Sequence, residues 1–515
     1  MMNKIKFLSL FLLIILAITS CQDNILDTNI DPVNDNDPTL DGTVSTVSGM
    51  ESFAKGVYNH TVDVVTPGTF KVWFWFTYGY HETMGDVLTM PWGNFGGRWV
   101  NQTESIILDD NTVVTPPSGG PQPGEIAVRN TRSAGSDNMT QYEWVDMYGI
   151  IGQCNIILEN IENVQGATAS QQDAFRAWAL WWKAYAYHRI GSMYEMGVIV
   201  NTSGEVNNNF VGNDAIIAES NRLLGELETV LVGVANTGEF NTVFANAQIE
   251  ITGNNVDIVG LQENINTLKA RNKVYNTKVI DMTDSDWNEV LNWTNAGVSS
   301  NTNAFTMKSE NTLLDNNWLP GAVTGFWYFP SPRLIQDIND GDARMDAYFE
   351  PNVFPNPRGR GIQYGMTHFW KDESSIVSST PNAVTMYYAG SYEENKLLLA
   401  EAKIRTGNIE GGLADLDAIR NFQNAGLAAT AGSGMNETQA LEEVRKERRL
   451  ALIFRGVNFY DARRYGISSG SRTGAWVLDA AGNLNTNATI KYGYLDYWPV
   501  PAFETDFNPL PSNPN

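Results

Sequence analysis

The sequence predicts a mainly α-helical protein made of tetratricopeptide-like helix pairs, with long loop-rich insertions between them. Several segments repeat apolar residues at three- and four-residue steps, which is the period of one helix face. Some of these segments follow one another across short turns, as at Thr406-Gly407-Asn408. Helix pairs of this kind bury their apolar stripes by stacking on their neighbours. The length of 515 residues allows one or two domains.

Helical periodicity is clearest in five ranges. These are 141–163, 170–194, 268–280, 392–405 and 409–419. Two further helix starts carry capping patterns, in which Thr283 pairs with Asp286 and Asn436 pairs with Gln439. Both patterns predict a helix that begins directly after its first residue.

Taken together, three long stretches between the helical segments are rich in Gly, Asn, Pro and aromatic residues. They are 59–140, 197–260 and 299–390. Structureless loops of this length are uncommon in compact domains and usually carry function. We therefore expect the helices to form the scaffold and these insertions to form the binding site.

Two insertion segments, 90–101 and 317–328, combine aromatic rings with amides and glycine. Rings stack on the apolar faces of sugars or fill pockets for peptides, and glycine lets a ligand approach closely. The predicted ligand contacts are Trp92, Arg98, Trp99, Asn101, Trp318 and Trp327. The alternative is that these rings fill the core between loop and helices. By contrast, Trp178, Trp181 and Trp182 follow helical spacing, which predicts that they are buried.

The N-terminus resembles a bacterial lipoprotein signal. Lys4 and Lys6 precede a short apolar run that is too short to span a bilayer, and the run ends in Ile-Thr-Ser before Cys21. This pattern predicts a signal peptide at 1–20, lipidation of Cys21, an acidic tether at 21–44 and a folded body at 45–515. The alternative is an ordinary signal peptide with a cysteine near its end. Cys154, then without a partner, is expected to be an apolar residue on a helix face.

Composition argues against several other classes. The formal net charge of −24 and the pI of 4.5 disfavour binding to nucleic acid. None of the four histidines lies at metal-ligand spacing, so neither a metal nor another cofactor is expected. The acidic run 337–342 lacks the spaced glutamate of an EF-hand, which favours a polar turn.

An enzyme is the main rival class. Residues 466–470 match Gly-x-Ser-x-Gly, but a nucleophile elbow needs a strand before it and a helix after it. Here a predicted helix precedes the motif. Paired carboxylates of a glycosidase are defined in space and cannot be read from a sequence. We therefore expect a binding protein, and a surface hydrolase stays the alternative.

Five segments, in this order, resemble the SusD/RagB family of outer-membrane lipoproteins. They are 176–194, 392–408, 416–420 with Asp417 where the family has Asn, 447–466 and 498–509. The chain departs from the family pattern elsewhere too: Arg455 replaces an acidic residue, Asn458 replaces an arginine and Ala451 replaces a common glutamate, and the tail lacks the family's final Gln-Asn-Pro-Gly. These charges normally pair inside the scaffold, so an altered ion-pair network is expected.

The resemblance implies a cell-surface protein, lipid-anchored in the outer membrane, that binds nutrient oligomers without cleaving them. Glycans are the implied ligands, with peptides as the alternative. It also implies a partner, a TonB-dependent outer-membrane transporter of the SusC type, over which the protein lies as a lid. In the family, acidic residues after the lipidated cysteine help export to the outer face.

Overall fold

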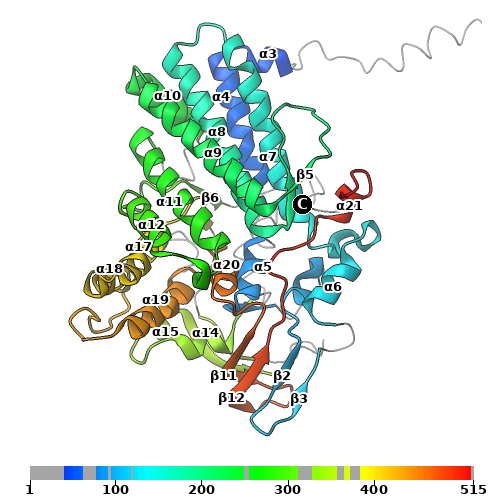
Figure 1. Ribbon diagram of the computed structural model, residues 1–515, viewed down its shortest axis with the longest axis vertical. Helices are drawn as coiled ribbons and strands as arrows, with labels where there is room; N and C mark the ends of the chain where they lie inside the picture. Colours follow the sequence, from blue (N-terminus) through cyan, green and yellow to red (C-terminus); the bar gives the residue numbers. More distant parts are fainter. Residues whose placement is uncertain are drawn as a thin grey trace, which may run out of the picture.

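The computed structural model describes residues 40–61, 77–90, 94–116, 120–248, 255–310, 328–355, 365–371 and 383–511. Helices dominate these residues (Figure 1). Cys21, Trp92, Trp318 and Trp327 lie outside the described residues, as does most of the predicted tether. The described end of the tether, Leu40–Val44, forms helix α3.

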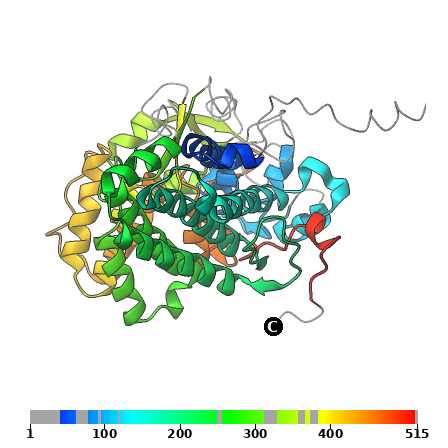
Figure 2. The ribbon, with the colours of Figure 1, turned by 90° about the horizontal axis from the view of Figure 1, so that it is seen from above.

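The helical scaffold fills the upper and left parts of Figure 1. It consists of α4 (Val47–Lys55), α7 (Gln141–Asn160), α8 (Ala169–Met193), α9 (Asn213–Gly233), α10 (Thr237–Ala247), α11 (Ile258–Asn276), α12 (Asp284–Asn295), α17 (Tyr392–Arg405), α18 (Ile409–Phe422), α19 (Glu437–Ala451) and α20 (Asn458–Arg464). Consecutive helices pack as pairs, notably α7 with α8, α8 with α9, and α17 with α18. In Figure 2, α4, α8 and α9 form successive layers with α8 in the middle.

A region with short strands lies at the lower end of Figure 1 and includes strands from outside the predicted insertions. Its four-stranded antiparallel sheet has the order β11 (Ser471–Leu478), β12 (Leu484–Lys491), β2 (Ser105–Ile107) and β3 (Val113–Val114). Four two-stranded antiparallel pairs are β1 (Leu88–Thr89) with β7 (Phe329–Pro330), β4 (Met196–Val198) with β5 (Phe210–Gly212), β6 (Thr306–Glu310) with β10 (Ala383–Tyr387), and β8 (Phe349–Phe354) with β9 (Met366–Trp370). Further short helices are α5 (Gly79–Met84), α6 (Gln122–Arg129), α14 (Pro332–Asp337), α15 (Ala343–Tyr348) and α21 (Ala502–Thr505).

The helical predictions are confirmed, with two corrections. Both predicted capping boxes are present, at Thr283–Asp286 and at Asn436–Gln439. The helix expected at 268–280 begins earlier, at Ile258, because Asp257 caps its N-terminus. The prediction that 197–260 is a loop is wrong, since α9 and α10 occupy much of it. The apolar stripe of α9 that contributes to the core comprises Ile216, Leu223, Leu224, Leu227 and Leu231.

The three tryptophans of α8 lie in the core, as their spacing predicts. Trp178, Trp181 and Trp182 are each 0% exposed. The indole of Trp178 donates a hydrogen bond to the carbonyl of Ala54 in α4 at 3.0 Å. The ring of Trp182 meets Tyr388 edge-on at 4.8 Å between centroids. These rings join α8 to α4 and to the segment that follows β10.

Buried arginine–carboxylate pairs cross-link the C-terminal helices. Arg464 binds Glu401 at 2.6 Å and Arg448 binds Asp461 at 2.8 Å, and all four side chains are at least nine-tenths buried. The departure at Asn458 has a local consequence, because its amide donates to the buried carboxylate of Glu82 at 2.7 Å. Burial raises the pKa of Glu82 to about 8, although hydrogen bonds from Asn458 and the Gly456 backbone oppose this rise.

Candidate functional site

The pairing of β1 with β7 joins the two insertion segments that the sequence singled out. Thr89, at the end of β1, lies opposite Phe329, at the start of β7. Segment 90–101 leaves β1 at this point, and segment 317–328 enters β7 there. Because the strands are antiparallel, the bases of the two segments are neighbours, although they are far apart in the sequence.

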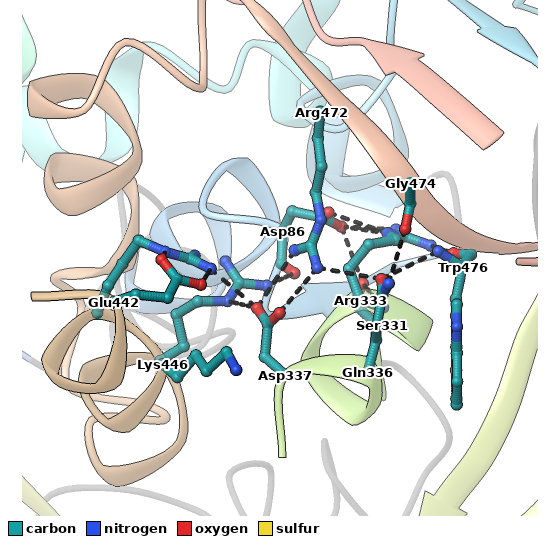
Figure 3. A network of polar contacts seen from close by, with 12 residues as sticks. Asp86, Ser331, Arg333, Gln336, Asp337, Glu442, Lys446, Arg472, Gly474 and Trp476 are labelled. Atoms are coloured by element: carbon teal, nitrogen blue, oxygen red, sulfur yellow. Dashed lines mark hydrogen bonds and ion pairs between the residues drawn. The ribbon is translucent and has the colours of Figure 1, made fainter. Parts of the chain in front are cut away.

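A buried carboxylate clamps this junction (Figure 3). Asp86, just before β1, accepts hydrogen bonds from Arg333, just after β7, at 2.9 Å to Nε and 2.5 Å to Nη2. It also accepts from the hydroxyl of Tyr492 at 2.5 Å and from that of Ser331 at 2.9 Å. Burial alone would raise the pKa of Asp86, but Arg333, the charge of Arg449 and the hydrogen bond from Tyr492 together outweigh burial and lower the pKa to about 2.

The network extends from the clamp to α19 and β11. Arg449 of α19 donates to the carbonyls of Gly85 and Asp86 at 2.8 and 2.7 Å. Asp337, at the end of α14, binds Arg449 and Arg472, each at 2.8 Å (Figure 3). The predicted polar turn at 337–342 therefore supplies carboxylates that bind arginines. Its last residue, Asp342, caps α15 and binds Arg344 at 2.7 Å. The β1–β7 junction is thus held by contacts among the Asp86 region, α14, α19 and the β11–β12 region.

Within the first segment, η3 (Asn94–Trp99) is 3-10 helix interrupted by a kink. Phe95 has φ 56° and Gly96 has φ 76°, the left-handed region that a non-glycine residue seldom adopts. The conformation is held because Tyr80 donates to the carbonyl of Phe95, and the Gly96 amide donates to Asp137 at 3.3 Å. A side chain at Gly96 would meet the Asp137 carbonyl at 2.8 Å. Backbone strain fixed in this way is typical of binding loops.

Trp99 ends η3 as a half-buried ring beside two guanidinium groups. The central carbon of Arg129 lies 3.7 Å from the ring centroid, and that of Arg98 lies 4.8 Å from it. Arg129, on α6, is also ion-paired with Glu125 one helical turn earlier. Cation–π contacts of this kind hold the ring in one orientation. The arrangement therefore places an oriented aromatic surface next to hydrogen-bond donors.

Asn101, the third described member of the predicted set, lies inside. Its side chain is 6% exposed, and its amide donates to the hydroxyl of Thr89 at 3.1 Å. It therefore ties the end of the segment back to β1. The structure thus brings Arg98 and Trp99 together at the surface, with Asn101 beneath them as a support.

Sequence reasoning missed the clamp entirely. Asp86, Arg333, Arg449 and Tyr492 come from four separate parts of the chain, and no local spacing connects them. Periodicity reports which face of one element is buried, and it contains no information on pairing between distant elements.

The described residues offer little support for catalysis. Among them, no group of three or more His, Cys, Asp or Glu side chains could hold a metal ion. Ser468 of the Gly-x-Ser-x-Gly motif is 1% exposed and lies between α20 and β11, so the helix comes before the strand. A nucleophile elbow requires the opposite order. Cys154 is buried in α7, and burial raises the pKa of its thiol, so the thiolate is strongly disfavoured.

Comparison with known proteins finds a family match in the C-terminal part of the chain. The model of the SusD family matches residues 364–514. The C-terminal part of the chain is therefore similar to the SusD family. A comparison with curated protein sequences finds no match. No helix in the described part of the chain is both long and apolar enough to cross a membrane.

Solved structures share the SusD fold over most of the chain. A putative sugar-binding protein from Bacteroides vulgatus has a TM-score of 0.59 at 16% identity, covering 92% of this chain and 99% of its own. A SusD superfamily protein from Bacteroides fragilis has a TM-score of 0.59 at 14% identity, covering 91% and 99%. A SusD-like carbohydrate-binding protein from Bacteroides vulgatus has a TM-score of 0.52 at 14% identity, covering 84% and 85%.

Proposed function

We propose that this chain is a SusD-family protein that binds nutrient oligosaccharides at the β1–β7 junction and delivers them to a TonB-dependent outer-membrane transporter. The observation that carries the proposal is the clamped junction, which joins two aromatic segments and presents Trp99 beside Arg98 and Arg129. Two of the proteins that share the fold are described as carbohydrate- or sugar-binding.

The chemistry of the site fits a sugar. A pyranose ring presents an apolar C–H face, which packs on the indole of Trp99, and hydroxyl groups, which accept hydrogen bonds from guanidinium N–H groups. Trp92, Trp318 and Trp327 are proposed as further contacts, because their segments join the chain at the two sides of the junction. Asn101 is assigned to positioning, since its amide is bound to Thr89.

A ligand screen tests the binding proposal. The purified chain without residues 1–20 is applied to matched glycan and peptide libraries, and each captured ligand is titrated by calorimetry and recovered for mass analysis. We expect affinity for one class of neutral glycan and recovery of that glycan uncleaved. Binding confined to peptides would replace the ligand class. Accumulation of shorter products would favour the surface hydrolase.

The location and partner are proposed from the N-terminal pattern and the family. Cys21 carries the lipid anchor, and the chain faces outward from the outer membrane above a SusC-type transporter. Cys21→Ala should abolish incorporation of labelled fatty acid and release the protein from the membrane. Native extraction of the wild type should recover a large β-barrel in near-equal amount. Recovery of the protein alone, across several detergents, would argue against the transporter.

A further inference from the structure

A second, separate groove lies between α9, α11 and α12. Its volume is about 490 Å³, which is within the ~300–1,000 Å³ range of small-molecule sites. None of its lining residues belongs to β1, β7, η3 or α6. The groove is therefore distinct from the proposed site at the β1–β7 junction.

The walls of the groove combine amides, a hydroxyl and one aromatic ring. Asn213 and Asn221 come from α9, Asn276 and Thr277 come from the end of α11, and Trp293 comes from α12. Among the described residues, the side chains of Asn213 and Thr277 have no hydrogen-bond partner. Trp293 is half-buried and lines the groove. The groove thus offers polar groups that can bind a ligand without first breaking internal bonds.

Charge on the groove walls is balanced. Lys269 binds Glu228 at 2.6 Å, and Lys273 binds Asp286 at 2.5 Å, so both lining ammonium groups are already paired. The two lining carboxylates belong to Asp214 and Glu289. An anionic ligand would have to compete with Glu228 and Asp286 for the two lysines. A neutral ligand with many hydroxyl groups meets no such competition.

The groove amides are also held in place from behind. Asn272, on the floor, donates to Asn221 Oδ1 at 2.8 Å and accepts from His188 at 2.7 Å. Burial lowers the pKa of His188 well below its usual range, so this ring is neutral and its Nδ1–H is the donor to Asn272. The amide NH₂ of Asn221 is consequently turned away from Asn272 and is free to donate.

From this lining we infer that the α9–α11–α12 groove is a second binding site, which takes a neutral saccharide unit stacked on Trp293. One saccharide face packs on the indole, while the amides of Asn213 and Asn221 and the hydroxyl of Thr277 bind its hydroxyl groups. The inference stands on the groove's own chemistry, so it holds or fails independently of the junction site.

Fluorine NMR of protein labelled with 5-fluorotryptophan tests this inference. The Trp293 resonance is identified as the one missing from Trp293→Phe. The probes are maltotriose, cellotriose and xylotriose, with digalacturonic acid as the anionic comparison and triglycine as the peptide comparison. We expect at least one neutral trisaccharide to shift the Trp293 resonance at millimolar concentration, and neither comparison probe to do so.

Two helix-surface variants provide the matched control. Ala218 is exposed and lines the groove, so Ala218→Phe should obstruct it and weaken binding at least tenfold. Thr229 is exposed further along α9 outside the groove, so Thr229→Phe should bind like the wild type. Trp99→Ala should leave the Trp293 shift unchanged, which separates this site from the junction. Absence of any shift with the neutral probes, equal loss in both phenylalanine variants, or a preference for digalacturonic acid would overturn the inference.

Discussion

Two groups of tryptophan show how position decides the role of one residue type. Trp181 lies in the middle of α8, is 0% exposed and packs on Phe305 at 5.4 Å between ring centroids. Trp99 ends a strained turn, is half-buried and lies beside two arginines. The first ring stabilises the scaffold, and the second is held in place yet accessible. Removal of each ring should therefore change a different measurable property.

The largest effect is expected from Trp181→Ala. Emptying a large core site costs about 3–5 kcal/mol of unfolding free energy. Chemical denaturation monitored by circular dichroism measures this loss, and ligand affinity of the remaining folded protein should be near that of the wild type. If stability is unchanged, Trp181 is not a core residue and the contrast with Trp99 fails.

A pH effect is expected next, from Glu82. The native state keeps this carboxyl protonated up to about pH 8, whereas the unfolded chain releases the proton above its ordinary pKa of 4.5. The free energy of unfolding therefore falls progressively as the pH rises through this window, by about 1.4 kcal/mol per pH unit. Stability should fall by about 3 kcal/mol between pH 5.5 and 7.5 from this group.

Glu82→Gln is the control for that effect, because glutamine is neutral and can still accept from Asn458. The variant should lose this part of the pH dependence and be more stable than the wild type at pH 7.5. Parallel stability curves for the two proteins between pH 5.5 and 7.5 would show that Glu82 is ionised in the native state.

A smaller effect is expected at the clamp. Tyr492→Phe removes one hydrogen bond to the charged Asp86, which is worth about 1.5–3 kcal/mol. Tyr392→Phe is the matched control, because the Tyr392 hydroxyl has no hydrogen bond within the described residues. Thermal unfolding should separate the two variants. Equal melting temperatures would mean that the clamp adds nothing to stability.

The scaffold was predicted well from the sequence because its helices are marked by local sequence patterns. Trp178 and Trp181 follow the helical period, and Thr283 with Asp286 forms a cap within three residues. The same kind of signal was available for α9, but the abundance of Gly and Asn led to a loop prediction for 197–260. Local composition therefore misled where the apolar period alone would have sufficed.

The site was predictable only in part. Glycine and aromatic residues marked the segment that contains Arg98 and Trp99, and the structure places both side chains together. The inward position of Asn101 depends on Thr89, and the clamp depends on pairing Asp86 with Arg333 across most of the chain. Such contacts follow from the tertiary fold, which periodicity and composition do not encode.

The most direct test of the account is a calorimetric titration of the double variant Trp92→Ala, Trp99→Ala with an oligosaccharide that the wild type binds. Each lost ring is worth about 0.5–1.5 kcal/mol, so affinity should fall roughly 5- to 150-fold while the circular dichroism spectrum and melting temperature stay those of the wild type. Unchanged affinity, or unfolding of the double variant, would contradict the claim that the β1–β7 junction carries the binding site.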